Sequence, residues 1–398
     1  MTDLTIVGGV YRERCIRPSW DAIYGSGGRA AVAAASLANT KLISYVHDHL
    51  KNDVENLARL SDFHIHPIAS YDPISFYYIH PLANPLISPS LHLIKKNPPI
   101  SVRADVVLRY GMLEGTAIVD AKVAIYDPQS AFAAEGFRAN GSRADRLAIV
   151  LNRYEAQSIV GTADAALAAD RLIQKEGAEV VVVKMGSNGA LVSWIGGSEL
   201  IPAYKTESVW KIGSGDVYST AFSVFWGVNG MNAADAARYA SIATADYCNG
   251  RTLPIREPSN LNLLEFKPVI PGNGKIYLAS PFFDLGQRWL VEESLAALRN
   301  MGAQVFSPVH DVGPGPAEIV CPADIQGLDE SQVVFAIING LDAGTIFEVG
   351  YAIKKGIPVV ALAENIKEED LKMFLGTGCV VTNDFTSAIY QAIWMMPE

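Results

Sequence analysis

A carboxylate occurs among apolar residues near the C-terminal end of the chain. The stretch TIFEVGYAIKKG (345–356) has helical spacing and ends at Gly356, and Glu348 lies in it beside Phe347 and Val349. Apolar neighbours withdraw water from a carboxylate, which raises its pKa and strengthens it as a nucleophile once it is ionised. Such a group suits cleavage of an N-glycosidic bond, because it can trap the anomeric carbon of an oxocarbenium-like transition state as an ester.

Two aspartates occur at the ends of neighbouring elements. Asp324 opens the helix-like stretch DIQGLDES, and Asp342 follows the apolar strand VVFAIING, six residues before Glu348. Because the carboxyl ends of parallel strands meet at one edge of a sheet, we expect the three acids to converge on one crevice. A second acid there could protonate the departing base or hold the sugar hydroxyls.

The first part of the chain has its own set of reactive residues around Asp216. Gly213, Ser214 and Gly215 come directly before an apolar helix, and Asp216 lies at its start. The backbone N–H groups of a glycine-rich turn at a helix N-terminus bind phosphate well. An aspartate beside them can accept the proton of an attacking hydroxyl, so this stretch predicts a phosphoryl-transfer site.

Three other stretches could complete that site. Asn152 and Glu155 in NRYE follow the strand LAIVLN at a spacing able to organise a hydrated Mg²⁺. The segment KMGSNGALV (184–192) is a strand, a turn and a second strand, which could line a nucleotide pocket. A second glycine-rich turn opens GSGGRAAVAAASLAN (25–39), where a sugar could dock. The residues assigned to the nucleotide pocket are Lys184, Gly186 and Gly189.

The elements that would position these groups alternate between strands and helices. DLTIVGG, VAIYDP, LAIVLN and EVVVVKMG are near-continuous apolar runs, as expected for strands buried on both faces of a parallel sheet. Helical stretches such as DAALAADRLIQKEG lie between them. After KIYLAS the same alternation continues through QVFSP, VVFAII and IPVVAL. Both parts are therefore predicted to be α/β, with ligands beyond the C-terminal ends of the strands.

The chain is predicted to divide once. Residues 256–274 contain three prolines and two glycines without helix or strand periodicity, which indicates a linker. It separates a first domain, residues 1–255, from a second domain, residues 275–398. Within the first domain, residues 67–100 are rich in proline and aromatic residues and predict antiparallel strands or a lid.

Composition excludes several classes of partner. The formal net charge is −10 and there are no long charge runs, which argues against a nucleic-acid partner. No apolar run approaches the ~18 residues of a membrane span, and no signal peptide is visible at the start. The four cysteines form no CxxC pair. They predict reduced thiols and a cytoplasmic protein. The expected partners are small molecules, namely nucleosides, nucleotides or sugars.

Residues 275–362 resemble the nucleoside 2-deoxyribosyltransferases and the related deoxynucleotide N-glycosidases. The resemblance rests on IYLASPFF (276–283), on the helix of Asp324 with LDESQVVFAII, and on GLDAGTIFEVGYA (340–352). It implies a flavodoxin- or Rossmann-like, doubly wound parallel sheet. It also implies roles for four residues: Glu348 as nucleophile, Asp342 on the sugar, Asp324 near the leaving base, and Tyr277 positioning the nucleophile. These residues do not separate base-exchanging transferases from hydrolases.

Residues 1–255 resemble the ribokinase-like (PfkB-type) sugar and nucleoside kinases. This implies an α/β/α sandwich, Asp216 as catalytic base, and ATP with Mg²⁺ as cofactors. Two departures from that family stand out. Trp210 and Lys211 occupy the positions of its usual Asp-Thr pair, and the first glycine-rich turn lacks the usual Asn, with Ala31 and Val32 in that region.

Two functions remain open on the sequence. In the first, the protein is bifunctional, and Glu348 cleaves or exchanges an N-glycosidic bond while Asp216 serves phosphorylation of a sugar or nucleoside. In the second, the kinase-like part binds a nucleotide without turnover and regulates or dimerises the glycosidase part. In both cases we expect a homodimer or larger homo-oligomer, since both families commonly bury the edges of their active sites against a second subunit.

Overall fold

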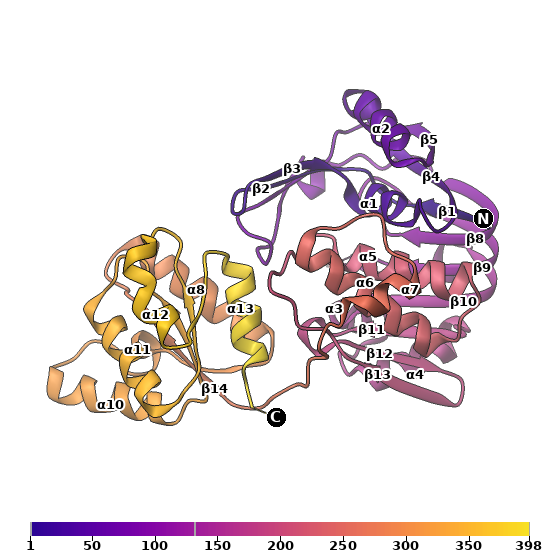
Figure 1. The fold of residues 1–398 in the computed structure, drawn as a ribbon. Helices are drawn as coiled ribbons and strands as arrows, with labels where there is room; N and C mark the ends of the chain where they lie inside the picture. Colours follow the sequence, from indigo (N-terminus) through magenta and orange to yellow (C-terminus); the bar gives the residue numbers. More distant parts are fainter. Residues whose placement is uncertain (1, 131–132, 398) are drawn as a thin grey trace. The chain divides into compact units, whose positions relative to one another are not determined.

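The computed structural model describes residues 2–130 and 133–397. The chain forms two compact units. The first contains the residues up to Thr206 together with Trp210–Pro268, and the second contains Glu207–Val209 together with the chain from Val269 onward. The break at Pro268 lies inside the segment 256–274, which also carries a short helix, α7 (Pro258–Leu261). Each unit is built of strands and helices, so the α/β prediction is confirmed for both (Figure 1).

The first unit is organised around one large sheet in which β12 pairs antiparallel with both of its neighbours, β11 and β13, and the other neighbouring pairs are parallel. Its nine strands, in spatial order, are β13 (Gly197–Ile201), β12 (Ala190–Trp194), β11 (Val180–Lys184), β10 (Arg143–Asn152), β9 (Ala117–Asp127), β8 (Ile100–Tyr110), β1 (Asp3–Val7), β4 (Asn39–Val46) and β5 (His64–Ala69).

Helices cover both faces of this sheet. Side chains alternate between two cores along each central strand; in β10, Ala148 and Val150 enter one core while Ile149 and Leu151 enter the other. The first core contains residues of α1 (Gly25–Ala34), α2 (Asp48–Ser61), α5 (Ser214–Phe222), a π-helical turn (Ser223–Val228) and α6 (Ala233–Gly250). The second contains residues of α3 (Arg153–Val160) and α4 (Ala165–Glu176). The unit is thus an α/β/α sandwich.

A second, four-stranded sheet belongs to the same unit. Its order is β3 (Trp20–Ile23), β2 (Arg12–Cys15), β6 (Ser75–Tyr78) and β7 (Leu86–Ser88). Residues 67–100 supply β6 and β7, which pair antiparallel. The other two strands come from residues 12–23, a stretch that the sequence did not single out as part of this layer.

The second unit contains a five-stranded sheet in which every neighbouring pair is parallel. The spatial order is β15 (Gln304–Phe306), β14 (Lys275–Ala279), β16 (Val333–Ile337), β17 (Val359–Leu362) and β18 (Val380–Thr382). Counted from β14, this is the order 2-1-3-4-5 of the flavodoxin-like doubly wound fold. The predicted fold class is confirmed.

The helices of the second unit lie on the two faces of its sheet. On one face, α10 (Ala317–Asp329) and α11 (Ala343–Lys355) pack on each other, and residues of both share a core with β14 and β16. On the other, α8 (Leu285–Asn300) contacts α13 (Phe385–Trp394). Short helices α9 (Pro308–Asp311) and α12 (Lys372–Gly376) complete the unit.

One predicted boundary is wrong. Asp324 was expected to open a helix, but α10 begins at Ala317 and contains Pro322, so Asp324 projects from its interior. The segment just before α10 is rich in glycine and proline, which concealed the start of the helix. A search of the described helices for a segment long and apolar enough to span a membrane finds none.

Candidate active sites

The topology of the second unit creates a crevice beside β14. The chain leaves β14 toward β15 on one side and later returns to β16 on the other, so the loops after β14 and β16 diverge. Ligands of doubly wound sheets bind at such a switch point, outside the carboxyl ends of the strands. Tyr277 lies in β14, and Asp342 with the helix of Glu348 follows β16.

Tyr277 and Glu348 are in direct contact. The Tyr277 hydroxyl donates a hydrogen bond of 2.6 Å to Oε1 of Glu348. Tyr277 is fully buried, and its ring stacks on Phe306 with 5.4 Å between ring centroids, which fixes the direction of the phenol. Glu348 is half-buried in the second turn of α11. The structure therefore brings the predicted nucleophile and its predicted positioning residue together.

The surroundings of Glu348 favour its protonated form. Burial, with a smaller contribution from the Asp324 and Asp342 carboxylates, raises the pKa of Glu348 to about 7, and the Tyr277 hydrogen bond opposes the shift. Burial and the adjacent Glu348 carboxylate hold the pKa of the Tyr277 phenol well above its ordinary value, so the phenol stays a donor. A carboxyl with a pKa near neutrality can act as nucleophile or as acid at physiological pH.

Asp324 acts on the same site from α10. Its charge affects the pKa of both Glu348 and Tyr277, so it lies within electrostatic range of their contact. Burial raises the pKa of Asp324, and its Oδ1 is buried with no hydrogen-bond partner among the residues described. An unpaired carboxyl oxygen at a switch-point crevice is available to a ligand.

Asp342 has a structural role that the sequence analysis did not assign to it. It is the N-cap of α11, and its Oδ2 accepts hydrogen bonds from the backbone N–H (2.9 Å) and hydroxyl (3.1 Å) of Thr345. The turn before it is unusual, because Leu341 follows the positive-φ Gly340 and itself has φ of 52°. Leucine rarely adopts this left-handed conformation, and such residues concentrate at functional sites.

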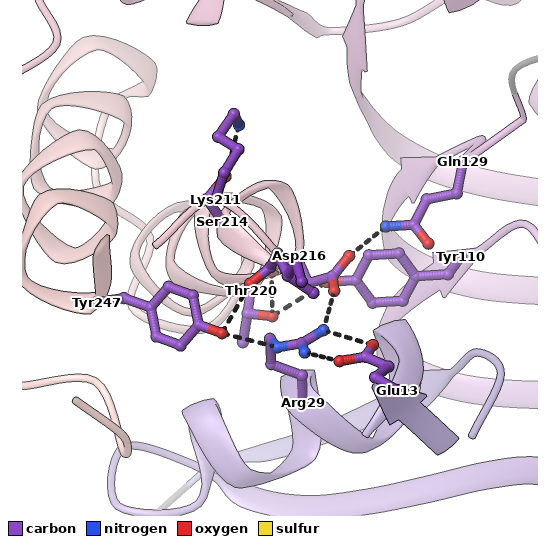
Figure 2. Close-up of polar contacts among 10 residues, drawn as sticks. Glu13, Arg29, Tyr110, Gln129, Lys211, Ser214, Asp216, Thr220 and Tyr247 are labelled. Atoms are coloured by element: carbon purple, nitrogen blue, oxygen red, sulfur yellow. Dashed lines mark hydrogen bonds and ion pairs between the residues drawn. The ribbon is translucent and has the colours of Figure 1, made fainter. Parts of the chain in front are cut away.

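The carboxylate of Asp216, at the start of α5, is held from two sides. Oδ2 accepts a hydrogen bond of 2.7 Å from Nη1 of Arg29, and Oδ1 accepts a hydrogen bond from the side-chain amide of Gln129. Figure 2 shows the Arg29 guanidinium between Asp216 and Glu13. The backbone carbonyl of Asp216 accepts a 2.9 Å bond from the Tyr110 hydroxyl, which anchors the first turn of the helix.

Arg29 and Glu13 were not among the residues predicted from the sequence. Arg29 is 1% exposed and forms a two-point ion pair with Glu13 of β2, while its Nε donates to the hydroxyl of Tyr247 at 3.1 Å. Burial alone would lower the pKa of Arg29, but the carboxylates of Glu13 and Asp216 raise it well above its ordinary value. The available signal was a charged residue inside the glycine-rich GSGGR turn.

Gly213 is required by both conformation and space. Its φ is 77°, and a methyl group at its Cα would lie 2.1 Å from Nε of Arg29. The turn therefore admits only glycine, and Arg29 packs directly against it. Gly186 and Gly189 also have positive φ, and a methyl group on Gly189 would lie 2.0 Å from the carbonyl oxygen of Ile201. These two glycines form the tight turn between β11 and β12.

Lys184 lies at the end of β11 and pairs with a residue that the sequence analysis did not select. Its Nζ is 2.7 Å from Oδ2 of Asp127, which also accepts a 2.6 Å bond from the hydroxyl of Ser219 in α5. Asp127 is fully buried and its Oδ1 has no partner in the described part of the chain. A methyl group added at Cα of Gly215 would lie 3.6 Å from Nζ of Lys184, so the lysine lies beside the glycine-rich turn.

The predicted magnesium residues have another use in the structure. Asn152 and Glu155 form a capping box on α3: Oδ1 of Asn152 accepts the N–H groups of Tyr154 and Glu155, and Glu155 accepts the N–H of Asn152. Burial raises the pKa of Glu155 to about 7. The described residues contain no cluster of three or more His, Cys, Asp or Glu able to hold a metal ion. This donor set does not fit a directly ligated Mg²⁺, whereas the start of α5 with Lys184 fits the phosphates of ATP.

Two segments of the chain match known families. Residues 121–246 match the pfkB family carbohydrate kinases, and residues 276–384 match the nucleoside 2-deoxyribosyltransferases. The chain therefore joins a kinase-like to a deoxyribosyltransferase-like segment, and both predicted resemblances are confirmed. No curated protein matches the chain.

Similar solved structures cover about two thirds of the chain. A fructokinase from Vibrio cholerae O395, with fructose, ADP and calcium ion bound, is 13% identical with a TM-score of 0.49 over 66% of this chain and 98% of that chain. A ribokinase from Thermotoga maritima is 16% identical with a TM-score of 0.46 over 66% and 99%. A pyrophosphate-dependent kinase in the ribokinase family is 15% identical with a TM-score of 0.44 over 64% and 97%.

Proposed function

We propose that the second unit cleaves or exchanges the N-glycosidic bond of a nucleoside or nucleotide, with Glu348 as nucleophile. The observation that carries the proposal is the 2.6 Å hydrogen bond from the buried Tyr277 phenol to Oε1 of Glu348. This bond fixes one carboxylate oxygen and leaves the other for the substrate. The match of residues 276–384 to the deoxyribosyltransferase family supports the same chemistry.

The reaction would proceed in two displacements. Ionised Glu348 attacks the anomeric carbon, an ester bond forms, and the bond to the base nitrogen breaks. Asp324, whose burial raises its pKa, gives its proton to the departing base. Water, or the nitrogen of a second base, then displaces Glu348 from the sugar and returns a proton to Asp324. The Asp342 oxygen not used by the cap would hold a sugar hydroxyl.

A panel of nucleosides and 5′-nucleotides tests this proposal. Each is incubated with wild type and with Glu348→Gln, with and without a second free base, and base release is followed by chromatography. Release without an acceptor base identifies a hydrolase, and release that depends on an acceptor identifies a transferase. If wild type releases no base from any member of the panel under either condition, the proposal is wrong.

A second candidate function belongs to the first unit. Asp216 at the start of α5, with Lys184 beside Gly215, supports ATP-dependent phosphorylation of a sugar or nucleoside, in which Asp216 accepts the hydroxyl proton. Bound ATP would supply the phosphoryl group. Both carboxylate oxygens of Asp216 already accept hydrogen bonds, from Arg29 and Gln129, so the acceptor hydroxyl must share or replace one of them.

The alternative for the first unit is a nucleotide-binding or dimerisation module without turnover. Phosphorylation of ribose, deoxyribose or nucleosides by ATP, lost in Asp216→Asn, would support the kinase. Nucleotide binding without transfer to any acceptor would support the module. We also propose a homodimer or larger assembly, and light scattering that gives a monomer at micromolar concentration would contradict it.

A further inference from the structure

The loop after β16 places a leucine in a backbone conformation that suits other residues better. Leu341 has φ of 52° and directly follows Gly340, which has φ of 83°. In this left-handed region the Cβ of leucine crowds the backbone, whereas glycine has no Cβ and asparagine adopts the region readily. The backbone alone therefore does not explain why a leucine occupies this position.

The contacts of the loop hold this conformation in place. The N–H of Leu341 donates a hydrogen bond of 3.0 Å to the carbonyl of Ile338, which is fully buried. The side chain of Asn339 donates to Oε2 of Glu364 at 3.2 Å and accepts the N–H of Glu364 at 2.8 Å, which ties the loop to the one after β17. On the other side, Asp342 caps α11. A turn held from both sides can keep a strained residue.

Packing within the protein does not explain the leucine either. Leu341 is 37% exposed, and in the described part of the chain it does not belong to the core that α11 shares with β14 and β16. Its place in the chain is at the carboxyl edge of the sheet, directly before Asp342. That aspartate lies within electrostatic range of Glu348. A strained, exposed and apolar side chain thus belongs to the loop that also carries the proposed sugar-binding residue.

We propose that Leu341 is a substrate-binding residue whose side chain packs on the C–H surface of the sugar. This rests on the proposed glycosidic function of the second unit and adds a sugar contact to its site. A furanose ring carries hydroxyls on some edges and C–H groups on others. Asp342 would hold a hydroxyl, and Leu341 would cover the neighbouring C–H groups and exclude water from them. The strained turn is retained because it places both side chains at one sugar.

Binding to the inactive variant Glu348→Gln tests this contact without turnover. Isothermal titration calorimetry on the full chain uses deoxyadenosine, deoxycytidine and their 5′-monophosphates as ligands. Leu341→Ala, Leu341→Asn and Leu341→Met are each added to Glu348→Gln, with Leu375→Asn as control. Leu375 is a 54% exposed leucine of α12. We expect the Ala and Asn variants to bind about 5- to 10-fold more weakly, because only the exposed part of the leucine is available to a ligand. The Met variant and the control should bind as Glu348→Gln does.

Leu341→Asn separates a ligand role from a structural one. Asparagine has nearly the shape of leucine and suits a positive φ, so this variant should unfold at the same urea concentration as Glu348→Gln or a higher one. If it also binds every ligand as Glu348→Gln does, the leucine only completes the turn and the proposal is wrong.

Two further results would overturn the sugar contact. The loss of affinity should be similar for the purine and the pyrimidine ligand, because the sugar is common to both. A loss confined to one of them would assign Leu341 to the base. Failure of Glu348→Gln to bind any of the four ligands would also contradict the proposal. If the ligands bind, Leu341→Asn weakens them and wild type releases no base, then the glycosidic proposal fails while the sugar contact stands.

Discussion

The phenol of Tyr277, in an interior strand of a parallel sheet, donates a 2.6 Å hydrogen bond to the carboxylate of Glu348, 71 residues later in the chain. The two side chains come from β14 and from α11, which follows β16, and these strands are neighbours in the sheet. The contact has two effects. It orients the carboxylate, and it lowers a pKa that burial would otherwise raise further.

Replacing this phenol should change the pH dependence of base release. Tyr277→Phe removes the donor that favours ionised Glu348, so the pKa of Glu348 should rise above its value of about 7. The acid side of the rate profile should move to higher pH, and kcat/KM at pH 6 should fall about 10- to 100-fold. Rates measured from pH 5 to 9 test this. A profile that falls in height without moving would assign Tyr277 a purely steric role.

The charge of Glu348 should also be visible in stability. Its pKa is near 4.5 in the unfolded chain and about 7 in the folded one, so only the folded state keeps the proton between these values. Stability should therefore fall as the pH rises from 4.5 to 7, by about 1–3 kcal/mol for a half-buried group. Glu348→Gln has no titrating carboxyl at this position, so its stability should not show this fall with pH. At pH 7.5 it should be more stable than wild type. Urea unfolding of wild type and Glu348→Gln at pH 5 and pH 7.5 measures the free energy of unfolding. If the mutation changes this free energy equally at both pH values, the prediction is wrong.

Asp342 should have two separable roles. Asp342→Ala removes the cap from Thr345 and should lower the free energy of unfolding by about 1 kcal/mol. Asp342→Asn retains capping ability and should unfold as wild type does. Both variants lack the carboxylate proposed to hold the sugar, so both should raise KM for base release. If Asp342→Asn has the wild-type KM as well as the wild-type free energy of unfolding, then Asp342 serves only as the cap.

The buried cluster of the first unit should be a major source of its stability. Arg29→Met leaves Glu13 and Asp216 as neighbouring buried carboxylates, and loss of one partner of such a pair costs about 3–5 kcal/mol. The control Arg143→Met breaks an exposed pair with Asp120 and should cost less than about 1 kcal/mol. Urea unfolding of the full chain compares them. If both variants lose a similar, small amount of free energy of unfolding, the cluster of Arg29, Glu13 and Asp216 contributes little to stability.

Much of the architecture could be predicted because the sheets are buried on both faces. Runs such as VVVV in β11 alternate between two cores, so continuous hydrophobicity, strand length and a parallel sheet go together. The residues of the second site could be predicted because each follows or lies in a recognisable strand or helix. Their contact could be expected from topology alone, since a switch point brings together the segments after β14 and β16.

The features that could not be predicted depend on contacts between residues far apart in the sequence or on patterns that fit two structures. Arg29 meets Asp216 across 187 positions, and no local pattern encodes that pair. Asn152 and Glu155 are spaced alike for a metal site and for a capping box, and the structure uses the second. Asp324 was placed at a helix start because Pro322 conceals the continuity of α10.

If Glu348 is the nucleophile, it must form a covalent bond with the sugar during the reaction. The most direct test is mass spectrometry of the acid-quenched protein after incubation with each nucleoside or 5′-nucleotide from which base is released. We expect wild type to carry one glycosyl adduct on the peptide that contains Glu348. Glu348→Ala should carry none and should release base at least about 10³-fold more slowly. Base release by Glu348→Ala at the wild-type rate, or an adduct on another residue, would show that Glu348 is not the nucleophile.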